Sequence, residues 1–168
     1  MQNAKDTFYE VMRERLATVN AERTVVVRGT TRPAVLVEEN ELSKVAPPKN
    51  CFRLRWTQAA VGMSSALPTT FLRCEIVYTT AGSNEQSGMD RGRVLAAMDA
   101  ELLAMVEQPV RNASKTNYAG VALGHNAAAM TTKVWWSSLA FGAVKATEDV
   151  LERMASVEVM ALEEAGER

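Results

Sequence analysis

Apolar and polar residues alternate along two stretches in the first half of the chain. In residues 51–57 the side chains of Phe52, Leu54 and Trp56 fall on one face. Residues 71–78 repeat the pattern, with Leu, Cys, Ile and Tyr at every second position. A period of two is typical of a strand with one buried face. Because the connection between these stretches is too short for a parallel crossover, we expect two neighbouring antiparallel strands.

Two other stretches carry apolar residues at the three- and four-residue spacing of an amphipathic helix. The first is residues 3–19, and the second is residues 90–107, which end before Pro109. Proline cannot continue a helix, so it fixes that end. Ser87 can cap the second helix, because Asp90 follows three residues later as a variant of the capping box. A strand with one apolar face that leads into such a helix favours packing of the helix across the sheet.

The remaining segments give weaker patterns. We expect strands at residues 23–28, 34–38 and 133–137. Non-regular structure is expected at residues 29–32 (a turn), 39–50 (a loop), 110–132 (an irregular stretch) and 139–146 (a connector). Residues 153–161 fit a helix or a strand, and the alternation of Val157 and Val159 with polar neighbours favours the strand.

These elements predict an α+β fold in a single domain of residues 1–168. Its sheet is expected to be mixed or mainly antiparallel, with the two long helices packed on one face. A chain of 168 residues is long enough to bury a core of this kind.

Composition and charge limit the partners that the protein can bind and the part of the cell in which we expect it. The formal net charge of −1 provides no field that would attract nucleic acid or a membrane surface. No apolar run approaches the roughly 20 residues of a membrane span, and the N-terminus lacks a secretory signal. We therefore expect a cytoplasmic protein with no membrane partner and no sequence-specific nucleic-acid partner. Cys51 and Cys74 are expected to be buried apolar residues rather than a disulfide.

The residues that perform catalysis are scarce. His125 is the only histidine, and it is expected to be an exposed loop residue, although a lone histidine can serve as a general base with Ser or Asp partners. The sequence shows no nucleophile motif, no clustered metal ligands and no phosphate-binding loop. We therefore expect no enzymatic activity, no metal and no cofactor.

Charged residues occupy the polar faces of the two alternating strands. Arg53 and Arg55 lie on the first, and Arg73 and Glu75 on the second. This face is either solvated, with a cross-strand Arg–Glu pair, or it contacts another subunit, where fixed charges set the register. The adjacent residues Trp135 and Trp136 point to opposite faces of a strand. One is expected in the core and the other at an interface or partly exposed, so all six residues are subunit-interface candidates.

The order of elements resembles the tail terminator (tail completion) family of long-tailed phages. The resemblance is carried by the N-terminal helix, by residues 32–38, by the strand of residues 71–78 running into the helix of residues 90–107, and by Lys-Val-Trp-Trp-Ser-Ser at residues 133–138. It implies a non-catalytic protein that forms a hexameric ring, caps the tail tube and joins it to the head-connector proteins. It also implies incorporation into a virion or a prophage-derived particle. The alternative is a small non-catalytic ligand-binding or regulatory α/β domain.

Overall fold

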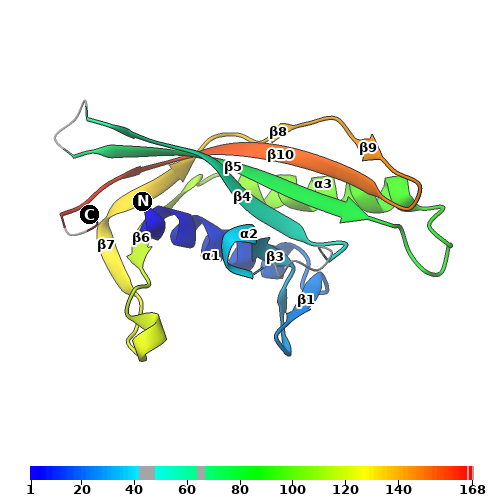
Figure 1. The fold of residues 1–168 in the computed structure, drawn as a ribbon, viewed down its shortest axis with the longest axis horizontal. Helices are drawn as coiled ribbons and strands as arrows, with labels where there is room; N and C mark the ends of the chain where they lie inside the picture. Colours follow the sequence, from blue (N-terminus) through cyan, green and yellow to red (C-terminus); the bar gives the residue numbers. More distant parts are fainter. Residues whose placement is uncertain (42–47, 64–66, 166, 168) are drawn as a thin grey trace.

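The computed structural model describes residues 1–41, 48–63, 67–165 and 167. The chain has an α+β fold in which two main helices pack against a curled sheet that forms a half-barrel (Figure 1). The helices are α1 (Gln2–Val19), the short α2 (Glu38–Glu41), α3 (Arg91–Val106) and a 3-10 turn, η1 (Val121–Leu123). The expected α+β class and the two long helices are therefore confirmed.

The main sheet is mixed and mostly antiparallel. Its strands in spatial order are β3 (Val35–Val37), β4 (Phe52–Gly62), β5 (Thr69–Thr80), β10 (Leu151–Leu162), β7 (Ala128–Trp136) and β6 (Asn112–Asn117). Two short strands, β8 (Ala140–Phe141) and β9 (Lys145–Ala146), also pair with β10. The β3–β4 pair is parallel, and the other pairs in this sheet are antiparallel. The predicted antiparallel pairing of the two alternating stretches is confirmed, because they are β4 and β5.

The core lies between the concave face of the sheet and the two long helices. Strand β5 buries Leu72, Cys74, Ile76 and Tyr78 there, and β10 buries every second residue from Ala155 to Ala161. From α1, Phe8 packs edge-on against Trp56 and Trp136, with ring centroids 5.9 and 5.6 Å away. From α3, the buried residues are Leu95, Met98, Leu102, Met105 and Val106. Both cysteines are buried and free, as predicted.

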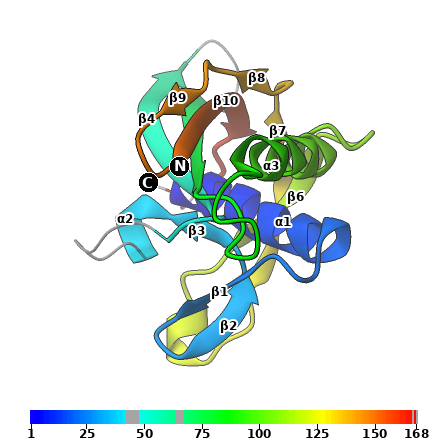
Figure 2. The ribbon, with the colours of Figure 1, turned by 90° about the vertical axis from the view of Figure 1, so that its right-hand side faces the viewer.

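The region after α1 differs from the prediction. Residues 29–32 were expected to be a turn, but Thr30–Pro33 is strand β2, which pairs with β1 (Thr24–Val27) in a separate hairpin (Figure 2). The turn is only Arg28 and Gly29, whose φ angles are 50° and 80°. Two consecutive residues with positive φ form the type I′ turn that suits the twist of a two-residue hairpin. The strand expected at residues 34–38 is the short β3.

The prediction of an irregular stretch at residues 110–132 is wrong. This region contains β6 and η1, and β7 begins at Ala128 rather than near residue 133. The expected connector at residues 139–146 contributes β8 and β9, and the loop expected at residues 39–50 begins within α2. Residues 42–47 of that expected loop lie outside the described residues.

Two further expectations concern the start of α3 and the end of the chain. Asp90, rather than Ser87, is the N-cap of α3, and Ser87 has a positive φ of 50° within the preceding loop. The Asp90 carboxylate accepts a hydrogen bond from the Ser83 backbone N–H at 2.8 Å, so it stabilises the loop. The strand expected at residues 153–161 is confirmed as the longer β10, which pairs with β5 over twelve positions.

Candidate subunit interface

The face of the main sheet that points away from α1 and α3 is here called the outer face. Side chains alternate along a strand, so burial of Leu54, Leu72 and Val159 on the concave side turns their neighbours outward. The outward side chains of the central strands include Arg53, Arg55, Phe71, Arg73, Glu75, Glu158 and Met160. All four charged residues singled out in the sequence therefore share this face.

Arg53 and Arg55 are held by an acidic residue that the sequence analysis did not identify. The Glu38 carboxylate, at the start of α2, lies 3.2 Å from Nη1 of Arg53 and 2.8 Å from Nε of Arg55. Hydrogen bonding from Arg55 is the main cause that lowers the pKa of Glu38. Arg53 is only 6% exposed and also lies 4.0 Å from Glu152 of β10. Both acidic neighbours belong to the same subunit and the side chain is buried, so Arg53 offers little surface to a neighbouring copy.

The second pair of charged residues is more accessible. Nη1 of Arg73 lies 3.8 Å from Glu158 of β10, directly across the strand pair, and both side chains are about half exposed. Glu75 is opposite Arg55 in the register of β4 and β5. Arg55, Arg73, Glu75 and Glu158 together form a charged band on the outer face. It carries charges of both signs that water and a neighbouring molecule can reach.

The two tryptophans point to opposite faces, as predicted. Trp136 is 4% exposed, and its indole N–H donates a hydrogen bond to the Val106 carbonyl at 3.1 Å. The guanidinium of Arg15 lies 4.9 Å from its ring centroid. Trp136 is therefore a core residue that connects the sheet with α1 and α3. Trp135 is half-buried on the outer face, and of the two tryptophans only Trp135 remains an interface candidate.

Beside the charged band lies an apolar row that the sequence analysis did not recognise. Cross-strand register aligns Ala60 of β4 with Phe71, Phe71 with Met160, and Met160 with Trp135. Phe71 is 43% and Met160 42% exposed. The row crosses four strands on the outer face. It could not be read from the sequence, because only the pairing of β4 with β5 was expected and the pairing of β10 with β5 and with β7 was not.

A buried ion pair was also missed. Lys115 of β6 points inward, its side chain is 1% exposed, and its Nζ donates hydrogen bonds to the Leu162 carbonyl and to the Glu167 carboxylate. Burial tends to raise the pKa of Glu167, but hydrogen bonds from Lys115, from the Glu164 backbone and from Asn3 lower it overall. This pair fastens the end of the chain to the edge of the half-barrel and is structural.

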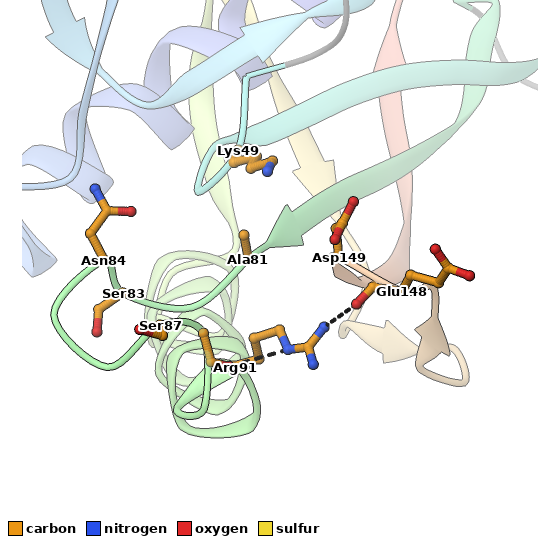
Figure 3. A pocket seen from close by; sticks show the side chains of 9 residues that line it. Lys49, Ala81, Ser83, Asn84, Ser87, Arg91, Glu148 and Asp149 are labelled. Carbon is orange, nitrogen blue, oxygen red and sulfur yellow. Dashed lines mark hydrogen bonds between the residues drawn. The ribbon is translucent and has the colours of Figure 1, made fainter.

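A polar pocket of about 380 Å³ lies between the loop before α3 and the segment before β10 (Figure 3). Arg91 crosses its floor and donates hydrogen bonds to the carbonyls of Gly88 and Glu148, at 3.2 and 2.9 Å. Lys49 and Asp149 bring opposite charges to its wall. Small-molecule sites are mostly apolar with a few polar groups, so this lining provides little support for the ligand-binding alternative.

The structure also locates His125, the one histidine considered as a general base. His125 is exposed in the loop after η1, and its backbone N–H donates to the Gly120 carbonyl. Among the residues that the structure describes, no group of three or more His, Cys, Asp or Glu residues is arranged to hold a metal ion. Within the same ranges, no helix has the length and apolar character needed to cross a bilayer.

Comparison with known protein families and with curated protein sequences found no match.

Proposed function

We propose that this protein is a structural component of a phage or prophage-derived particle, similar to a tail terminator. Its copies assemble into a closed ring of six that caps the tail tube and joins it to the head-connector proteins. The single observation that carries this proposal is the outer face, where an exposed apolar row adjoins exposed charges of both signs. The ring size, the two partner proteins and the place in the virion follow from the resemblance of the sequence to the family.

The charges on the outer face can exchange partners at small cost. Exposed ion pairs contribute only about 0–1 kcal/mol, so the separated, half-exposed pair of Arg73 and Glu158 can open in favour of groups on a neighbour. Fixed charges of both signs determine which partner and which register fit. The near-neutral chain, with a formal net charge of −1, also lets several copies approach without strong repulsion.

The apolar row provides the centre of the proposed contact. Protein interfaces combine an apolar core with a polar rim, and tryptophan is enriched among the residues that dominate binding energy. Trp135, Met160 and Phe71 lie in one row, and Arg73 and Glu158 occupy the next outward row. A contact of this face with a different surface of the next copy is head-to-tail, and it closes into a ring when the rotation between copies permits.

The proposed function involves no catalysis. On the outer face Arg55 pairs with Glu38 and Arg73 with Glu158, and the described residues hold no group of three or more His, Cys, Asp or Glu residues that could bind a metal ion. We therefore assign the protein a role in assembly within the host cytoplasm, followed by incorporation into the particle.

Charge reversal on the outer face tests the proposal. Arg73→Glu should reduce the ring fraction seen by sedimentation velocity at high protein concentration, and Trp135→Ala should do the same. Arg28→Glu is the matched control, because it makes the same charge change on an exposed residue of the β1–β2 turn, away from this face. Arg53→Glu is unsuitable, because it would place an uncompensated charge at a buried position. Assembly that is unchanged in both outer-face variants would exclude this face from the contact.

A further inference from the structure

One margin of the main sheet has a strand edge with no pairing partner among the described residues. Strand β3 pairs with β4 only from Phe52 to Leu54, because the chain turns away into α2 after Val37. From Thr57 to Gly62, β4 has β5 on one side and, within the described residues, no strand on the other. Figure 2 shows β4 at this margin of the sheet. Backbone N–H and C=O groups of alternate residues therefore face outward, as on any edge strand.

In the part of the chain that the structure describes, this edge lacks most of the features that usually prevent edge pairing. Proteins protect edge strands with lysines, prolines, bulges or a covering element. The β4 bulge lies between Trp56 and Gln58, before most of the open stretch. The open sequence, Thr-Gln-Ala-Ala-Val-Gly, contains no charge and no proline. The two terminal strands of the sheet differ from this edge, since β3 is entirely buried and Thr7 of α1 donates to and accepts from the backbone of Thr116 of β6.

We propose that the β4 edge pairs with the β4 edge of a second copy of this chain, antiparallel and about a two-fold axis at Ala60. In an antiparallel pair of strands, two directly opposed residues project their side chains to the same face of the sheet. With Ala60 opposite Ala60 of the partner subunit, Ala59 faces Val61 of the partner subunit, and Gln58 faces Gly62 of the partner subunit. No charge opposes a like charge in this register, and the small side chain of Ala60 lies at the axis, where identical residues meet.

The outer apolar row independently supports this register. The row runs from Trp135 through Met160 and Phe71, and it ends at Ala60 on the open edge. Phe71 also lies over Gly62, where an added Cβ would come within 3.2 Å of its ring. Placing the axis at Ala60 continues the row into the second copy. On the concave side it brings together the exposed Val61 side chains and Ala59 of both copies, so apolar surface is buried on both faces.

This two-fold contact can be tested separately from the proposed ring. It uses the strand edge and the Ala60 end of the apolar row, whereas the ring contact is tested at Arg73 and Trp135, which lie on other strands, so each contact can be present or absent without the other. Variants of the edge and variants of Arg73 therefore report on different surfaces, and failure of one proposal can be told from failure of the other.

Cysteine cross-linking tests the pairing directly. Facing residues of antiparallel strands have Cα atoms about 4.5–5.5 Å apart, which is within the range for a disulfide. Ala60→Cys should give a disulfide-linked dimer under mild oxidation, about tenfold more than Ala119→Cys, a control on an exposed loop. Burial raises the pKa of the native Cys74 thiol, and Cys51 is also buried, so neither competes.

Charge variants give a second test that does not require oxidation. Ala60→Lys and Ala60→Glu each place like charges across the axis, which destabilises a cross-strand pair. At protein concentrations too low for ring assembly, each variant should be monomeric in sedimentation equilibrium. An equimolar mixture should restore the dimer, with circular dichroism confirming native folding. The proposal is overturned if Ala60→Cys cross-links no more than Ala119→Cys. It is also overturned if the mixture remains monomeric, or if the single-charge variants associate as wild type does.

Discussion

Lys115 offers the sharpest test of the packing, because its ammonium group is almost fully buried in a strand whose one apolar residue is Ala113. The perturbation is Lys115→Met, which retains most of the side-chain volume and removes the charge. It leaves the Glu167 carboxylate, 3% exposed, without its cation. Removing one partner of a buried pair typically costs about 3–5 kcal/mol.

The structure indicates that the loss in the free energy of unfolding lies at the lower end of this range. The Glu167 carboxylate still accepts hydrogen bonds from the Asn3 side chain at 3.0 Å and from the Glu164 backbone N–H at 2.7 Å. The Leu162 carbonyl loses the hydrogen bond from the ammonium group. We therefore expect a decrease of about 3 kcal/mol in the free energy of unfolding, measured by urea denaturation to avoid the ionic screening of guanidinium.

A double-mutant cycle separates the pair from other effects of the substitution. Glu167→Gln alone should cost a similar amount, because it leaves the buried ammonium group without its anion. The double variant Lys115→Met/Glu167→Gln should lie within about 2 kcal/mol of wild type, since replacing a whole buried pair is often neutral. If Lys115→Met costs less than about 1 kcal/mol, or if the two losses simply add, the buried pair does not anchor the end of the chain as described.

Two further predictions concern the core and the acid limb of stability. Leu102→Ala, at a position 1% exposed on α3, should lower the free energy of unfolding by about 2–5 kcal/mol in urea, and a loss below about 1 kcal/mol would contradict the packing of α3. The pKa of the Glu38 carboxyl is lowered in the folded protein, mainly by the hydrogen bond from Arg55. The ionised carboxylate therefore stabilises the fold fully at pH values above its ordinary pKa of 4.5, and this stabilisation is lost as the pH falls through the lower pKa of the folded state. The stability difference between wild type and Glu38→Gln should therefore shrink in acid, and a difference that grows there would contradict the pairing.

The strands in which apolar residues occupy every second position were the ones that the sequence predicted most accurately. In β5 and β10 the inward positions are mostly aliphatic or aromatic, so alternation gives both the element and its buried face. In β6 the buried inward position is Lys115, whose partner lies 52 residues later in the chain. No local pattern signals such a strand, and this explains why residues 110–132 were expected to be irregular.

The candidate site was predictable only in part. Alternation alone places Arg55, Arg73 and Glu75 on the outer face, and it separates Trp135 from Trp136. It does not show that Arg53 is buried, because Glu38 and Glu152 reach it from other elements of the fold. The open edge of β4 was likewise hidden, since it depends on where β3 ends and on the turn of the chain into α2.

Electron microscopy of the purified protein at high concentration is the most direct test of ring assembly. We expect class averages of a closed ring with six-fold rotational symmetry, and loss of those rings in Arg73→Glu but not in Arg28→Glu. Two-fold pairs without rings would support the β4 edge contact and contradict the ring. Particles that remain single subunits at every concentration, in the presence and absence of tail tubes, would contradict the proposed assembly role.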